Sequence, residues 1–80
     1  MNKIPIKLDT FDKIKSFAKD IVKFESDVNL YKGSQTFDAK SILSIVVLLD
    51  LSNEVEVQII SSKEDEIVKF IKTMSKYESR

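Results

Sequence analysis

The chain has 80 residues, of which 13 are basic and 13 acidic, and it contains neither cysteine nor histidine. One domain, residues 1–80, accounts for this length because a second hydrophobic core would not fit. The absence of cysteine excludes a disulfide framework and indicates a reducing cytoplasm. Zero net charge argues against nucleic-acid and anionic-membrane partners, which usually require clustered positive charge. The longest apolar run, 45–49, is too short to span a bilayer.

The first predicted element is a strand at the N-terminus. Ile4, Ile6 and Leu8 alternate with polar residues and proline, the period-2 pattern of a half-buried strand. Because Pro5 has no N–H to donate to a neighbouring strand, we expect this strand at the edge of its sheet.

An amphipathic helix is predicted next, with Asp9 or Thr10 as its cap. Its apolar residues recur at helical spacing and predict a buried face: Phe11, Ile14, Phe17, Ala18, Ile21 and Val22. The charged residues between them predict a solvated face: Asp12, Lys15, Lys19, Asp20 and Lys23.

A β-hairpin is predicted over 28–38. Residues 28–32 and 35–38 flank Gly33-Ser34, and a two-residue Gly-Ser link fits a type II′ turn. The following segment, 42–51, has two interpretations. Its Val and Ile content suits a buried strand, whereas its length and the preceding Asp38 and Ser41 suit a short capped helix. Residues 50–53 then indicate a turn.

The last two predicted elements are a strand and a helix. Val55, Val57 and Ile59 alternate with polar residues, which predicts a strand with one wet face. The spacing of Ser61 to Glu64, and of Ser62 to Asp65, matches a capping box. The predicted apolar stripe of this helix is Ile67, Phe70, Ile71, Met74 and Tyr77. Glu64, Asp65 and Glu66 at its start, with Lys72 and Lys76 near its end, complement the helix dipole.

The predicted order is therefore β-α-β-β-α-β-α, an α+β fold with helices on one face of a sheet. This order, together with residues 23–30, Gly33, 39–42 and 54–55, resembles HPr, the small phosphocarrier of the bacterial sugar phosphotransferase system. The resemblance implies an open-faced sandwich, in which three helices cover a four-stranded antiparallel sheet.

The HPr resemblance also identifies a missing site. The family's histidine, followed by Ala-Arg-Pro, corresponds to Thr10, and the arginine corresponds to Asp12. A threonine hydroxyl lacks the leaving-group character that lets imidazole pass a phosphoryl group on. The charge of Asp12 would also repel phosphoryl oxygens. We therefore expect no histidine phosphoryl carriage, no catalytic residue and no enzyme activity.

A second family site is retained. The serine that a dedicated kinase phosphorylates in the family corresponds to Ser41, where helix N–H groups would favour a phosphate. The alternative is that Ser41 only begins the helix. Family residues that contact partner proteins correspond to Lys40, Ile42, Leu43 and Val46. Because 42–49 is largely apolar, some side chains would be exposed and form an interface, unless the segment is fully buried or a strand.

A lost histidine and a retained serine make the chain similar to the catabolite-repression HPr-like paralogue, which signals through phosphoserine to a transcription regulator. The chain departs from this paralogue at Asp12, and from the family glycine at Ser44. We expect a monomeric regulatory module that binds a phosphotransferase-system component, HPr kinase or a transcription regulator. The alternative is a docking module that acts without phosphorylation. No cofactor is expected, and no metal, because 64–66 has no histidine or cysteine nearby.

Overall fold

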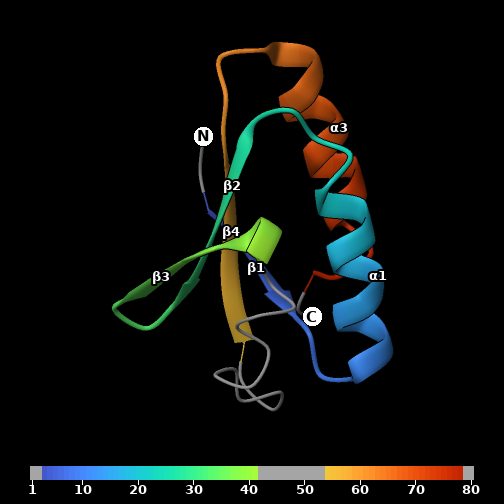
Figure 1. Cartoon of the computed structure of the whole chain (residues 1–80), viewed down its shortest axis with the longest axis vertical. Coiled ribbons are helices and arrows are strands. Elements are labelled where there is room, and N and C mark those ends of the chain that lie inside the picture. Colours follow the sequence, from blue (N-terminus) through green and yellow to red (C-terminus); the bar gives the residue numbers. More distant parts are fainter. Residues whose placement is uncertain (1–2, 42–53, 79–80) are drawn as a thin grey trace.

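The computed structural model describes residues 3–41 and 54–78, which form a four-stranded antiparallel sheet and two helices (Figure 1). The strands lie in the order β1-β4-β2-β3. In chain order the elements are β1 (Ile4–Lys7), α1 (Phe11–Ile21), β2 (Asp27–Lys32), β3 (Gln35–Asp38), the 3-10 turn η1 (Ala39–Ser41), β4 (Glu54–Ile60) and α3 (Glu64–Met74).

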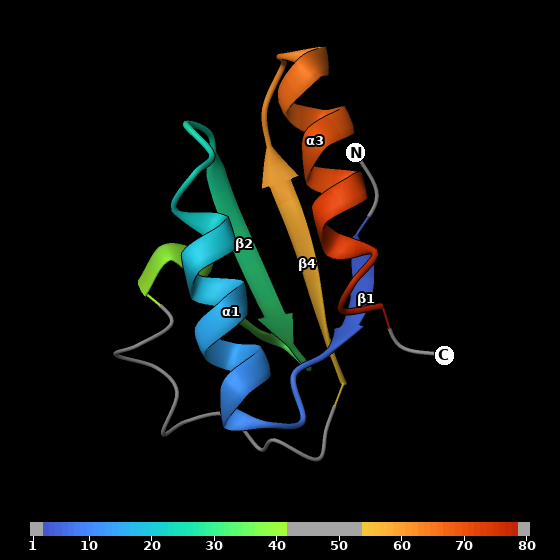
Figure 2. The same ribbon diagram turned by 90° about the vertical axis from the view of Figure 1, so that its right-hand side faces the viewer.

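The two helices lie side by side on one face of the sheet (Figure 2). This arrangement confirms the predicted α+β class and the open antiparallel sheet. The third predicted helix over 42–51, its alternative as a strand, and the turn at 50–53 all lie outside the residues that the structure describes.

The edge position predicted for the first strand is confirmed. β1 is the last strand of the sheet order, beside β4, and Pro5 lies opposite Glu56 in that antiparallel pairing. On its other side, Ile6 forms an isolated bridge with Glu78. The hairpin prediction is also supported by the backbone. Gly33 has φ +61°, whereas no described non-glycine residue has positive φ, so Ser34 does not adopt the second positive φ of a type I′ turn. This combination fits type II′.

The core lies between the helices and the sheet. Alternate strand residues such as Leu30 and Val57 are fully buried beneath Phe17 of α1 and Phe70 of α3. Two edge-to-face aromatic pairs join the α1 side to the α3 side, with ring centroids 5.6 Å apart in both: Phe17–Tyr77 and Phe24–Phe70.

Three residues assigned to buried helix faces are instead exposed. Phe11 is 58% exposed, Val22 65% and Ile71 46%. Successive helix residues are separated by about 100° around the axis. Val22 directly follows the buried Ile21, and Ile71 directly follows the buried Phe70. One step of this size turns each side chain away from the core. The stripe prediction was therefore too wide in both helices.

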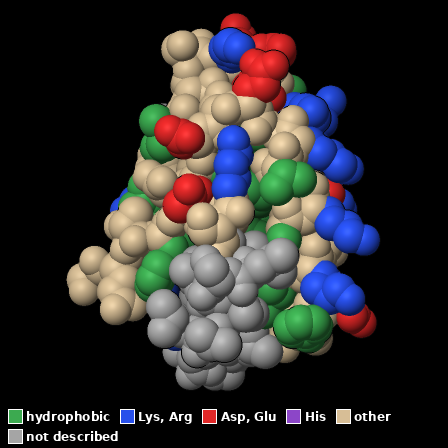
Figure 3. Space-filling view, viewed as in Figure 1, with side chains coloured by type: hydrophobic (Ala, Val, Ile, Leu, Met, Phe, Trp, Pro, Cys, Tyr) green, Lys and Arg blue, Asp and Glu red, His purple; other side chains and the backbone are tan. Residues whose placement is uncertain are grey.

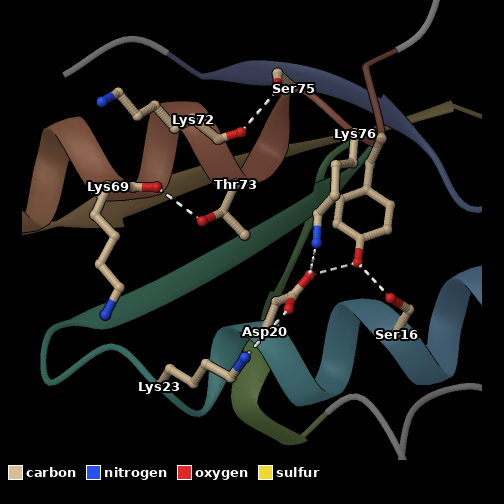
Figure 4. A network of polar contacts seen from close by, with 9 residues as sticks. Ser16, Asp20, Lys23, Lys69, Lys72, Thr73, Ser75 and Lys76 are labelled. Atoms are coloured by element: carbon tan, nitrogen blue, oxygen red, sulfur yellow. Dashed lines mark hydrogen bonds and ion pairs between the residues drawn. The ribbon is translucent and has the colours of Figure 1, made fainter.

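Asp20 was assigned to the solvated face of α1, and that prediction was wrong. Its carboxylate is buried and accepts hydrogen bonds from the Tyr77 hydroxyl at 2.6 Å and from Lys76 Nζ at 2.8 Å (Figure 4). The Ser16 hydroxyl lies 2.9 Å from the Tyr77 oxygen. Burial alone would raise the pKa of Asp20, but hydrogen bonds from Lys76 and Tyr77 lower it overall.

The helix caps also differ from one another. Thr10 caps α1, as predicted, but Lys63 is the N-cap of α3 and makes no side-chain cap hydrogen bond. The predicted capping boxes are therefore wrong. The Ser61 hydroxyl accepts from the Lys63 backbone N–H at 3.0 Å, within the preceding turn. In the first turn of α3, Glu66 binds the backbone of a different segment. Its carboxylate accepts hydrogen bonds from the N–H groups of Glu25 and Ser26, at 2.9 and 3.2 Å.

Candidate functional site

Thr10, which the sequence comparison above matched to the family's histidine, has a structural role at the start of α1. Its backbone is extended, with φ −134° and ψ 155°, and its Oγ1 accepts a hydrogen bond from the Lys13 N–H at 3.1 Å. This is the geometry of an N-cap residue. The hydroxyl oxygen is therefore engaged by the helix end.

The surroundings of Thr10 are acidic on both sides. Asp9 binds Lys13 across one helical turn at 2.8 Å, and the hydrogen bond from Lys13 lowers the pKa of Asp9. Asp12 is exposed in the first turn, where a negative charge is favourable for the helix dipole. Two carboxylates within two residues of Thr10 therefore stabilise the helix start. The geometry of Thr10 is that of a helix cap.

Ser41, the predicted phosphorylation site, lies on η1, which directly follows β3 of the hairpin. The Asp38 carboxylate accepts a hydrogen bond of 2.9 Å from the Lys40 backbone N–H. Aspartate side chains commonly stabilise turns in this way. Ala39 is fully buried and anchors η1 to the core. Lys40 is half-buried and Ser41 is exposed. The chain therefore holds Ser41 on the surface of a segment that is fixed at two points.

Ser41 and Thr10 lie at different positions along the axis of α1. η1 contacts α1 and β2, and both views place it beside the second half of α1, away from the first turn (Figures 1 and 2). Figure 2 also shows α1 between η1 and α3. Thr10 and Ser41 therefore lie along the same helix, with Ser41 on the flank of α1 that faces away from α3.

An exposed stripe on α1 was missed by the sequence prediction. The exposed Phe11, Lys15 and Val22 recur at helical spacing and share one side of the helix, with the partly buried Ala18 between them. Ser16 and Asp20 contact Tyr77 and so mark the flank that faces α3. The exposed stripe is on the opposite flank, beside η1. The sequence holds one signal of this stripe. Val22 directly follows Ile21, and two successive helix residues, about 100° apart, cannot both face the core centrally.

Several predicted positions are not described. Ile42, Leu43 and Val46 lie outside the described residues, so of the predicted partner-binding set only Lys40 is placed. Within residues 3–41 and 54–78, no group of three or more acidic side chains is arranged to hold a metal ion. Neither α1 nor α3 is long and apolar enough to cross a membrane.

Known proteins resemble this chain in sequence and in fold. The family model described as "PTS HPr component phosphorylation site" matches residues 13–78, a span that begins just after Thr10 and Asp12. The crystal structure of HPr-C-His from Thermoanaerobacter tengcongensis is similar, with a TM-score of 0.67 and 21% identity, over 94% of this chain and 92% of that one. No curated protein was found to match the chain. The family match extends over most of the sequence, and the fold agrees with it. The chain belongs to the HPr family of the phosphotransferase system.

Proposed function

We propose that residues 1–80 form a single regulatory module of the HPr type, which binds a partner protein, carries no phosphate on histidine and receives a phosphate on Ser41. The observation that supports this proposal is the difference in charge around two exposed residues. Thr10 caps α1 and lies between the carboxylates of Asp9 and Asp12, whereas Ser41 follows Lys40 on an anchored turn beside α1. The module acts in the cytoplasm as a monomer and is not an enzyme.

Phosphorylation of Ser41 would change the surface charge at one defined place. A phosphoserine carries about −1.5 to −2 charges near neutral pH and accepts strong hydrogen bonds. Lys40 is adjacent and half-buried, and its backbone is held by Asp38. The modification would therefore place negative charge beside a positioned cation, on the flank of α1 that carries Phe11 and Val22.

The partner surface in this proposal has two parts. One is Lys40 with Ile42, Leu43 and Val46, the positions carried over from the family resemblance. The other is the exposed α1 stripe, in which Phe11 and Val22 are more than half exposed. Apolar side chains with a polar rim are typical of protein interfaces. Suitable partners are a phosphotransferase-system component, HPr kinase or a transcription regulator.

The phosphorylation is tested by incubating the protein with ATP and the HPr kinase of its host and measuring the intact mass. One added phosphate is expected, and it should disappear in Ser41→Ala. The matched control is Ser34→Ala, which removes another exposed serine, at the hairpin turn, and should leave the phosphate in place. A kinase that adds no phosphate, or adds it equally to Ser41→Ala, would contradict the proposal.

A second candidate is a docking module that works without phosphorylation. The exposure of Phe11 and Val22 favours it, because these side chains need no modification to form a contact. Phe11→Glu and Val22→Glu would then weaken binding to a phosphotransferase-system partner, with Ser41→Ala unchanged. Ile60→Glu is the control, since Ile60 is 50% exposed at the end of β4. Equal binding by all four variants would remove this candidate.

A further inference from the structure

Residues 75–78 follow α3 and lie against β1, at the edge of the sheet (Figure 2). The Lys7 N–H donates a hydrogen bond to the Tyr77 carbonyl oxygen at 2.8 Å, and Ile6 forms an isolated antiparallel bridge with Glu78. We call residues 75–78 the closing strap, because they return the chain from the end of α3 to the first strand.

The closing strap completes the protection of the β1 edge that Pro5 begins. Alternate residues of an antiparallel strand direct their backbone groups to the same side, and the Lys7 N–H points to the strap. Pro5 and Lys7 therefore both face away from β4. Pro5 has no N–H, and the Lys7 N–H is bonded to the strap, so neither residue offers a free donor to an added strand. Proline and a covering segment are two ways in which proteins protect sheet edges.

A buried side chain anchors the closing strap to α1. Tyr77 packs edge to face on Phe17, with ring centroids 5.6 Å apart. Its hydroxyl donates to the Asp20 carboxylate at 2.6 Å and lies 2.9 Å from the Ser16 hydroxyl. The strap therefore joins β1, through its backbone, to α1, through this ring and hydroxyl.

Lys76 supplies a second anchor for the strap. Figure 3 shows a column of basic side chains along the side of the molecule that the helices form. The ammonium of Lys76 lies 2.8 Å from the same Asp20 oxygen that accepts from Tyr77 (Figure 4). Two side chains of the strap thus converge on one carboxylate. Loss of the Tyr77 hydroxyl would weaken this anchor without changing the pairing of β1 with β4.

The closing strap is attached to the sheet differently from the strand that it covers. β1 pairs with β4 at four positions, whereas the strap meets β1 at one isolated bridge. Neighbouring residues of a strand direct their N–H groups to opposite sides, so the Ile6 N–H faces β4 when the Lys7 N–H faces the strap. The strap can therefore leave β1 without breaking a hydrogen bond between β1 and β4.

We propose that the closing strap opens as one unit while the sheet and both helices stay folded, and that this opening uncovers the β1 edge. Local segments of a protein commonly open at a lower free energy than the whole molecule unfolds. In the open state the Lys7 N–H is free to pair with an added strand, so the strap controls access to this edge. Its contacts lie on the flank of α1 that faces α3, away from η1, so the inference does not depend on the proposed function.

Native-state hydrogen exchange of the ¹⁵N-labelled protein, in urea below the unfolding transition, tests the proposal. The amides of Lys7 and Tyr77 should exchange together and with a weak dependence on urea, because opening the strap exposes little surface. The Ile6 amide, which faces β4, should exchange more slowly. Its exchange should have the steep urea dependence of global unfolding.

Two conservative variants sharpen this test. Tyr77→Phe keeps the ring and removes the hydroxyl that binds Asp20, so it should accelerate exchange of the Lys7 amide roughly tenfold. The matched control is Tyr31→Phe, which removes a hydroxyl outside the strap that donates to Gln58 at 2.8 Å. This control should leave Lys7 exchange nearly unchanged, because the strap opens without disturbing that hydrogen bond.

Three results would overturn the proposal. The first is an equally steep urea dependence for the Lys7 and Ile6 amides, since the edge would then be uncovered only by global unfolding. The second is an equal acceleration of Lys7 exchange in Tyr77→Phe and Tyr31→Phe. The third is a Lys7 amide without protection in the wild type, which would show that the strap does not cover the edge.

Discussion

The two halves of α1 are held in different ways. In the first turn, the side chains of Thr10 and Asp9 bind Lys13, which lies within one helical turn of both. In the second half, Asp20 binds Tyr77 and Lys76, which follow α3 near the end of the chain. Local contacts stabilise one helix end, whereas long-range contacts hold two helices together. Thr10, the position that the resemblance matches to the family's histidine, lies in the locally held half.

The largest effect should come from breaking the long-range half. Asp20→Ala leaves the Tyr77 hydroxyl and the Lys76 ammonium without their buried acceptor. We expect a loss of about 2–3 kcal/mol in the free energy of unfolding, as for hydrogen bonds to a charged group. Asp12→Ala, in the exposed first turn, should cost much less. Urea unfolding of both variants measures the difference, and equal losses would show that the two halves do not differ in this way.

The same carboxylate makes stability depend on pH. Hydrogen bonds lower the pKa of Asp20 in the folded protein, despite its burial. A group with a lowered folded pKa contributes stability above its unfolded pKa, near 4. That contribution is lost as the pH falls through the folded pKa. The wild type should therefore lose more unfolding free energy than Asp20→Asn between about pH 5 and pH 2. Parallel pH profiles would contradict this assignment.

Substitutions in the first turn of α1 should reduce stability less, and the main effect should come from loss of the Thr10 cap. Thr10→Ala removes the side-chain acceptor for the Lys13 N–H and should cost about 1 kcal/mol of stability. Thr10→Ser keeps that acceptor and should cost much less. Thermal unfolding of the pair separates capping from other roles. If both variants lost the same stability, the hydroxyl would not be the group that matters.

The smallest expected effect is a gain in stability at the start of α3. α3 begins at Lys63 without a side-chain cap, so Lys63→Ser should supply one and raise stability by about 0.5 kcal/mol. The variant also loses the exposed ion pair with Glu25, which is of little consequence for stability. A measurable decrease in melting temperature would show that this ion pair outweighs the new cap.

Sequence patterns predicted the elements whose signals are local. Alternation identified β1 and β4, Gly33 identified the hairpin, and Thr10 was among the predicted caps. These predictions are confirmed because each depends on residues that are neighbours in the chain. The α+β class followed from the order of the elements and from the resemblance to HPr.

Other features depend on contacts that sequence spacing does not reveal. Asp20 was assigned to solvent because its burial requires Tyr77, which is far away in the chain. Ser61 was predicted to cap α3, but its hydroxyl accepts a hydrogen bond from the Lys63 N–H in the turn that precedes the helix. Phe11 and Val22 seemed to be core residues because apolar character does not distinguish a buried arc from an exposed flank. The candidate interface on α1 was therefore missed, and the phosphorylation of Ser41 remains a prediction.

The most direct test of the contrast between Thr10 and Ser41 is phosphosite mapping by peptide mass spectrometry of the protein purified from its native cells. The proposed function predicts a phosphate on Ser41 and none on Thr10. A phosphate on Thr10 would contradict the capping role assigned to that hydroxyl. Protein that carries no phosphate on Ser41 under any growth condition would contradict the proposed modification.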